Sequence, residues 1–216
     1  MTTMRVRLLI GAVVLAVVGA APMVASADEY FDPNTKKWVK YTPRWFGGTS
    51  TKNYKPRPKY RRQEVYFSTE EKPGTIVINP DRYYLYYVLG NNRAIRYGVG
   101  VGREGFGWEG RVKIGRKATW PSWAPPKEML ERQPDLPKFM KGGIKNPLGA
   151  RALYLFDGRK DTLYRIHGTN EPWTIGYNVS SGCIRLINDD VIDLHKRAKV
   201  GTPVVVQKAG FFSFFN

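Results

Sequence analysis

Short apolar runs alternate with turn residues through most of the chain after residue 73. Residues 83–89 form one such run, which is followed by Gly90-Asn91-Asn92 and a returning run at 94–101. This is the pattern of two antiparallel strands joined by a hairpin turn. The same pattern predicts further strands at 75–78, 152–156, 163–167 and 204–206. We therefore expect a largely antiparallel β core.

Helical patterns are few and short. A helix is predicted at about 189–199, with Asn188 as its N-cap, acidic residues near its start and basic residues near its end. Residues 126–132 predict a second, shorter helix, with Pro134 beyond its end. The remainder of 102–150 is rich in Gly, Pro and Trp, which predicts a long irregular insertion. Such an insertion is either a lid or substrate-binding loop, or a surface excursion whose Trp side chains pack onto the domain.

The N-terminus has the pattern of an export signal. Arg5 and Arg7 precede an apolar stretch at 8–18, and Ala25-Ser26-Ala27 is an A-x-A cleavage site. We predict a signal peptide at 1–27 that leaves Asp28 as the new N-terminus; the alternative is an uncleaved anchor. The stretch is short for a membrane span, and no other segment is apolar enough to cross a bilayer. We therefore expect an exported protein of the periplasm or cell envelope, without a transmembrane segment in the mature chain.

Residues 28–72 are expected to form a basic arm that contains prolines and aromatic residues.

 The stretch 33–63 holds ten basic residues and no acidic one, together with many Pro, Gly, Thr and Asn. Self-repulsion and the prolines favour an extended, flexible arm, which is either a tether to anionic envelope material or a solvated spacer. The formal net charge of +17 supports association with an anionic envelope surface, and nucleic acid is not expected as a partner of an exported protein.

Residues 209–216 form a Phe-rich tail, which either covers an edge of the domain or meets a partner or membrane interface.

The candidate chemistry centres on Cys183, the one cysteine of the chain. A lone cysteine cannot form an internal disulfide, so it is a buried bystander, half of an intermolecular bond or a reactive thiol. His167 lies sixteen residues upstream and is the candidate base. The Gly182 and Cys183 amides are candidate donors to an oxyanion. Arg185 would either clamp a substrate carboxylate or support the local structure.

The motif Ile166-His167-Gly168-Thr169-Asn170-Glu171-Pro172-Trp173, followed by Ser180-Ser181-Gly182-Cys183-Ile184-Arg185-Leu186, resembles the signature of the L,D-transpeptidase catalytic domain (YkuD) family. The likeness covers roughly residues 73–208, which we take as the catalytic domain. It implies a mainly β fold with a β-sandwich-like core. One position departs from the family pattern, because Ser181 replaces the usual histidine before Gly-Cys. We expect Ser181 to have a supporting hydrogen-bond role.

The resemblance also implies an activity. Cys183 would attack the carbonyl after the third residue of a peptidoglycan stem peptide and release D-alanine, with His167 as base and acid and the Gly168 carbonyl orienting its ring. An amine of a second stem or of an envelope protein would then take the acyl group. The alternatives are a hydrolase on the same scaffold and a non-catalytic wall-binding protein. No cofactor or metal is expected, because the one Cys and two His of the chain are not spaced like the ligands of a metal site. His195 lies on the predicted helix, where it is expected to be exposed or to pack against the domain.

Overall fold

The computed structural model describes residues 29–32, 37–40, 54–103, 108–132 and 134–208. The predicted signal peptide at 1–27 and the Phe-rich tail at 209–216 lie outside the described residues. Among the described residues, no helix is both long and apolar enough to cross a bilayer.

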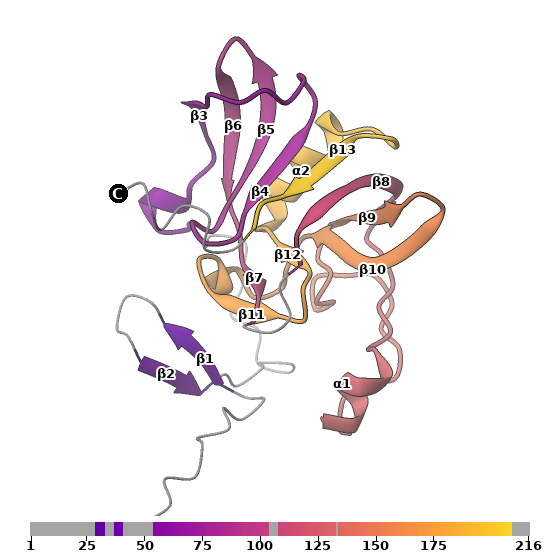
Figure 1. Cartoon of the computed structure of the whole chain (residues 1–216). Coiled ribbons are helices and arrows are strands. Elements are labelled where there is room, and N and C mark those ends of the chain that lie inside the picture. The colour runs from indigo at the N-terminus through magenta and orange to yellow at the C-terminus, as the bar shows by residue number, and fades with distance from the viewer. Residues whose placement is uncertain (1–28, 33–36, 41–53, 104–107, 133, 209–216) are drawn as a thin grey trace, which may run out of the picture.

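One nine-stranded sheet forms the body of the described part of the chain, in the order β12-β10-β9-β8-β13-β4-β5-β6-β3 (Figure 1). Most neighbours are antiparallel, but β13–β4 and β10–β12 are parallel. The strands of this sheet are β3 (Gln63–Tyr66), β4 (Ile76–Asn79), β5 (Tyr84–Gly90), β6 (Arg93–Gly98), β8 (Gly110–Thr119), β9 (Arg151–Asp157), β10 (Lys160–His167), β12 (Ile184–Arg185) and β13 (Pro203–Val206).

Smaller elements complete the described structure. β7 (Val101–Gly102) pairs in parallel with β11 (Asn178–Ser180), and β1 (Glu29–Asp32) pairs antiparallel with β2 (Lys37–Lys40). The α-helices are α1 (Lys127–Arg132) and α2 (Asn188–Arg197), and short 3-10 helices lie at η2 (Pro58–Tyr60) and η3 (Pro172–Thr174).

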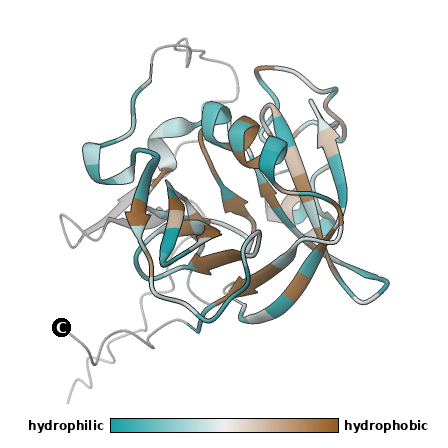
Figure 2. Ribbon diagram, turned by 90° about the horizontal axis from the view of Figure 1, so that it is seen from above, coloured by the Kyte–Doolittle hydropathy of each residue, from teal (hydrophilic) through white to brown (hydrophobic). Residues whose placement is uncertain are grey.

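The main core lies between the two halves of this sheet. Ile78 of β4 and Leu85 of β5 share one hydrophobic cluster with Leu155 of β9 and Ile166 of β10, and Leu194 of α2 belongs to it too. All five side chains are fully buried. Apolar residues accordingly concentrate in the strands, and polar residues in the helices and loops (Figure 2). The predicted mainly β, sandwich-like fold with few short helices is confirmed.

The predicted irregular insertion contains a long central strand. β8 covers Gly110–Thr119 and lies between β13 and β9 in the sheet. Ile114 is its one fully buried large side chain, while Arg111, Lys113 and Arg116 are exposed. The sequence does not predict this strand, because its residues are mainly polar and lack an alternation of apolar and polar positions. Pairing with the neighbouring strands holds it in place. Among the described residues of the insertion, the longest irregular part follows β8 at about 120–150 and contains α1.

The C-terminal part of the predicted flexible arm is folded onto the domain. β3 pairs antiparallel with β6, so a strand of the main sheet lies inside the stretch assigned to the arm. Tyr60 is 4% exposed, and a side-chain carbon at Gly98 or Gly176 would collide with it. The arm prediction was wrong for 54–66, because Tyr60 fills a space made by two glycines that are distant in sequence.

Several charges of this segment also have specific partners. The Arg57 guanidinium lies 5.2 Å from the Tyr177 ring centroid and donates to the Tyr177 hydroxyl. Arg62 lies 3.4 Å from Asp193 and 3.7 Å from Asp190, both on α2. These contacts join the segment to the domain by charge as well as by packing.

The start of α2 differs from the predicted cap. Asn188 is the first helical residue, and the cap position is Ile187, which makes no side-chain cap bond. Asn188 Oδ1 instead accepts a hydrogen bond from the Ala150 amide at 2.9 Å. The asparagine therefore joins α2 to the start of β9 instead of closing its own helix.

Candidate active site

Strand register brings the chain segments of the predicted nucleophile and base together at one edge of the sheet. In the parallel β10–β12 pair, Ile166 lies opposite Ile184 and His167 lies opposite Arg185. Ile166 and Ile184 are buried in the core. Because side chains alternate along a strand, Arg185 and His167 turn to the other face, and Cys183 directly precedes β12. The two halves of the sequence motif thus meet at the β10–β12 edge.

The His167 ring is held by the following residue. His167 is 4% exposed, and its Nδ1 lies 2.6 Å from the Gly168 carbonyl oxygen. A carbonyl only accepts, so Nδ1 carries the proton and Nε2 is left as the acceptor. Burial, with a smaller effect of the Arg185 charge, lowers the pKa of His167 to about 3. The imidazole is therefore neutral at physiological pH and able to take a proton.

Glycine is required after His167 by packing. A side-chain carbon at Gly168 would lie 2.3 Å from Asn188 Oδ1 and 3.0 Å from the Ala150 amide nitrogen. Asn188 thus fills the space beside the carbonyl that orients the histidine ring. The contact expected from the resemblance, between His167 and the Gly168 carbonyl, is present. Asn188 of α2 packs against Gly168 and so supports this contact.

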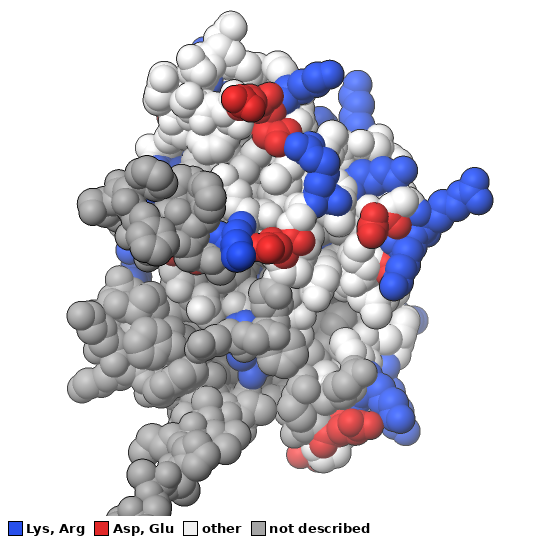
Figure 3. All heavy atoms as spheres, viewed as in Figure 1, with Lys and Arg blue, Asp and Glu red and all other residues white. Residues whose placement is uncertain are grey.

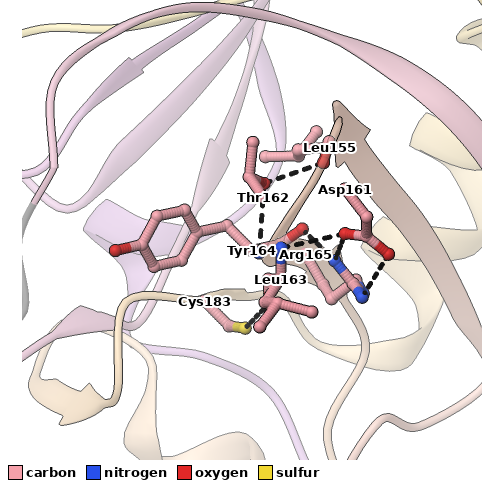
Figure 4. A network of polar contacts seen from close by, with 7 residues as sticks. All are labelled: Leu155, Asp161, Thr162, Leu163, Tyr164, Arg165 and Cys183. Carbon is pink, nitrogen blue, oxygen red and sulfur yellow. Dashed lines mark hydrogen bonds and ion pairs between the residues drawn. The ribbon is translucent and has the colours of Figure 1, made fainter. Parts of the chain in front are cut away.

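The thiol of Cys183 points to a bulge in β10 (Figure 4). Its Sγ lies 3.9 Å from the Leu163 carbonyl oxygen, where the β10–β9 register shifts between Asp161 and Arg165. Leu163 has a φ of 63°, a left-handed value that is strained for a non-glycine residue. The Arg165 guanidinium spans the bulge by donating two hydrogen bonds to the Asp161 carboxylate, at 2.6 and 2.9 Å. Strained bulges of this kind recur next to active sites, where they re-aim groups of the chain.

Burial keeps the thiol protonated in this arrangement. It raises the pKa of Cys183 above its ordinary value, although the Arg165 amide and the charges of Arg165 and Arg185 act in the opposite direction. The thiol and the imidazole are therefore both neutral. An attack by this thiol would need its proton to pass to a base during the reaction, because no preformed ion pair is present.

Ser180 organises the turn before the nucleophile. Its Oγ accepts from the Gly182 amide at 3.2 Å and donates to the Cys183 carbonyl at 2.5 Å. Gly182 has a φ of 103°, which only glycine adopts readily. The Gly182 amide, one of the two predicted oxyanion donors, is thus already engaged. Within the described part of the chain, Ser181 makes no side-chain hydrogen bond, and the supporting bonds expected of it come from Ser180.

Arg185 is held by an acidic residue of the same motif. Its Nη1 lies 3.2 Å from Glu171 Oε2, and the two side chains are 15% and 9% exposed. Glu171 is fixed in turn, because its amide donates to Thr169 Oγ1 at 3.0 Å. Of the two roles predicted for Arg185, this pair favours local support. The role of Glu171 was missed, although it lies in the quoted motif.

Trp108 was also missed as a site residue. Its ring stacks on Tyr164 with centroids 4.9 Å apart and an interplanar angle of 8°, and its Nε1 donates to the Gly182 carbonyl at 3.2 Å. The local sequence holds no signal for this contact, because Trp108 and Gly182 are separated by 74 positions.

His195 lies away from this site. It is partly buried on α2, its carbonyl accepts from Lys117 Nζ at 2.5 Å, and its Nε2 has no hydrogen-bond partner among the described residues. Burial lowers its pKa to about 4. This is the helix-packing role expected for it. Among the described residues, no group of three or more His, Cys, Asp and Glu side chains is placed to hold a metal ion.

Fold and site together define a β-sandwich protein with a histidine at the end of β10 and a cysteine directly before the adjacent strand β12. Residues 73–206 match the family model of the YkuD L,D-transpeptidase catalytic domain. The chain therefore belongs to the L,D-transpeptidase catalytic domain family, as its sequence motif predicts.

Individual relatives agree with this assignment. The chain is 38% identical over 140 residues to the probable L,D-transpeptidase ErfK/SrfK of Escherichia coli, covering 61% of this chain and 43% of that protein. It is 39% identical over 138 residues to the probable L,D-transpeptidase YbiS of the same organism, covering 60% and 43%. The chain thus spans less than half the length of these two relatives.

A solved structure from Brucella melitensis, described as a probable carnitine operon oxidoreductase caia, is 52% identical. The match covers 70% of the present chain and 96% of the Brucella melitensis chain, with a TM-score of 0.48. A TM-score below 0.5 is too low for this likeness to bear on fold or activity.

Proposed function

We propose that this chain is a peptidoglycan L,D-transpeptidase with Cys183 as nucleophile and His167 as general base and acid. The observation that carries the proposal is the 2.6 Å contact between His167 Nδ1 and the Gly168 carbonyl. It leaves Nε2 as a proton acceptor at the end of β10, beside the strand that Cys183 directly precedes. Family membership supports a peptidoglycan stem peptide as the substrate.

The first half-reaction forms a thioester. His167 Nε2 takes the thiol proton as Cys183 Sγ attacks the carbonyl carbon between the third stem residue and D-alanine. The carbonyl oxygen becomes an oxyanion within reach of the Cys183 amide. The C–N bond then breaks, the D-alanine nitrogen takes the proton from His167, and the acyl group stays on sulfur.

The second half-reaction transfers the acyl group to an amine. The acceptor amine attacks the thioester carbon while His167 takes a proton from its nitrogen. The C–S bond breaks and His167 returns that proton to the sulfur. With a second stem as acceptor the product is a 3→3 cross-link, and with a lysine of an envelope protein it is a wall-attached protein. Water in place of the amine would give a carboxypeptidase.

Incubation with purified tetrapeptide-containing peptidoglycan fragments, followed by mass spectrometry, tests the proposal. We expect joined stems with loss of D-alanine, and no product from Cys183→Ala. Loss of D-alanine without joining would favour the hydrolase. No reaction, combined with wall binding that survives Cys183→Ala, would favour the non-catalytic binding protein.

The proposal includes export to the cell envelope. The N-region, apolar stretch and A-x-A site at 1–27 support it. Intact-mass measurement of the protein recovered from the envelope of an expressing bacterium should give a chain that starts at Asp28. A mass that retains residues 1–27 would favour the uncleaved anchor.

A further inference from the structure

Trp108 contacts the nucleophile turn from a distant part of the chain. It lies just before β8, is partly buried against the main core, and stacks on Tyr164 of β10. Tyr164 is next to Leu163, the residue whose carbonyl faces the thiol (Figure 4). The stack therefore fixes the indole ring relative to the strand that carries His167.

The indole N–H reaches one particular oxygen. Nε1 donates to the Gly182 carbonyl at 3.2 Å. That carbonyl belongs to the same peptide unit as the Cys183 N–H. A peptide unit is planar and trans, so its C=O and N–H point in opposite directions. Holding the oxygen toward Trp108 therefore directs the Cys183 N–H to the opposite side of the chain.

The neighbouring peptide groups are held by Ser180. Its hydroxyl binds the Gly182 N–H at 3.2 Å and the Cys183 C=O at 2.5 Å. Neither bond sets the Gly182–Cys183 peptide plane directly, because rotation about the bonds on either side of that plane leaves these groups nearly in place. The Trp108 bond acts on the plane itself. Gly182, with a φ of 103°, would otherwise allow this peptide to turn.

We infer that Trp108 is a positioning residue, which holds the Gly182–Cys183 peptide so that the Cys183 N–H meets the oxyanion of acyl transfer. The inference rests on the proposed function, because an oxyanion forms only when Cys183 attacks a carbonyl. A donor that is already oriented stabilises the oxyanion without reorganising during the reaction. Loss of the indole N–H should therefore slow acylation more than it slows other reactions of the same thiol.

Two small reagents separate these effects in the full chain. An aryl ester acylates the thiol through a tetrahedral oxyanion, whereas iodoacetamide alkylates it by displacement at carbon, with no oxyanion. Trp108→Phe keeps an aromatic ring for the stack and removes the N–H. Tyr164→Phe is the matched control, because it keeps the ring and alters only a hydroxyl. If Trp108→Phe fails to fold, benzothienylalanine at position 108 replaces only the N–H with sulfur.

The readout is the ratio of the acylation rate to the alkylation rate. We expect Trp108→Phe to lower that ratio at least about tenfold, because removal of an oxyanion donor typically slows a reaction about 10²- to 10³-fold and misorientation is a partial loss. Tyr164→Phe should leave the ratio unchanged. An unchanged ratio in Trp108→Phe would overturn the inference, even if both rates fell, because an equal fall in both rates leaves the ratio the same.

The ratio does not depend on the natural substrate. A wild-type protein that fails to process tetrapeptide fragments would contradict the proposed function, whatever the ratio. A wild-type protein that processes them, with the same ratio in Trp108→Phe, would contradict only the role of Trp108. The two failures are thus distinguishable.

Discussion

At the scale of single residues, the proposed nucleophile and base are both neutral. Burial lowers the pKa of His167 and raises that of Cys183. The Gly168 carbonyl fixes the imidazole tautomer in which Nε2 accepts. The pair is therefore suited to proton transfer during attack, and its pH dependence should differ from that of an exposed cysteine–histidine pair.

The acylation rate should stay nearly constant from about pH 7 to about pH 5. With the His167 pKa lowered to about 3, the imidazole stays neutral over this range. An imidazole with the ordinary pKa of 6.5 would become protonated, and the rate would fall about 25-fold. Aryl ester acylation across this range measures the profile. A fall with a midpoint near pH 6.5 would contradict the buried, neutral base.

Glu171→Gln should destabilise the protein by about 3 kcal/mol. It leaves the mostly buried Arg185 cation without its carboxylate partner, and breaking a buried pair on one side typically costs about 3–5 kcal/mol. Denaturant unfolding measures the change. Glu64→Gln is the matched control, since it breaks the exposed Arg93–Glu64 pair at 3.0 Å and should cost less than about 1 kcal/mol. Equal effects of the two changes would argue against a structural role for Glu171.

At the scale of elements, α2 carries a poorly compensated charge. Asp190 is 4% exposed, and its Oδ2 has no hydrogen-bond partner among the described residues. Burial raises its pKa to about 6, against the opposite effect of Arg62 at 3.7 Å. The neutral, protonated form of the Asp190 side chain is therefore more compatible with the folded state than the charged form. That contribution is complete below pH 3.8 and is lost as the pH rises through about 6.

Asp190→Asn should thus stabilise the protein at pH 7 by at most about 3 kcal/mol, because one pKa unit corresponds to about 1.4 kcal/mol and the raised pKa already includes the opposite effect of Arg62. The gain should vanish near pH 3.5, where the native side chain is already neutral. Thermal unfolding at both pH values measures it. Asp189→Asn, on the exposed side of the same helix turn, is the control and should give no such gain, because its side chain is not buried. A destabilised Asp190→Asn at pH 7 would show that the Arg62 pair outweighs burial.

At the scale of the whole molecule, the basic N-terminal region divides into two parts. Residues 54–66 belong to the folded body through Tyr60, Arg62 and β3. On the face shown in Figure 3, basic and acidic side chains of the folded body are interspersed rather than gathered in one patch. The basic residues before 54 remain the candidate tether, and we propose that they bind the anionic wall.

Two truncations separate stability from wall binding. A chain that starts at Tyr54 should keep the unfolding midpoint, whereas one that starts at Phe67 should lose at least about 3 kcal/mol, because it lacks the buried Tyr60 ring and β3. Chemical unfolding compares them. The chain from Tyr54 should also bind isolated cell wall more weakly than the mature chain at low salt, and the difference should shrink at high salt. Unchanged wall binding would identify the earlier residues as a spacer.

Much of the fold could be predicted because its signals are local. The hairpin at 90–92 depends on residues that adopt left-handed conformations, and Gly90, Asn91 and Asn92 all have positive φ. The strands at 75–78 and 152–156 were visible as apolar runs. β8 and β3 were not visible, because their residues are mainly polar and their pairing partners lie far along the chain.

The candidate site divides in the same way. Sequence alone predicted which groups would carry the chemistry, because the thiol, the imidazole and the glycine before the thiol are properties of residue type and spacing. Tertiary structure decided how they are held: Asn188 behind Gly168, Glu171 on Arg185, Ser180 on the Gly182 amide and Trp108 on the Gly182 carbonyl. Orientation and pKa depend on burial and on partners brought together by folding, and neither is encoded in any short stretch of the chain.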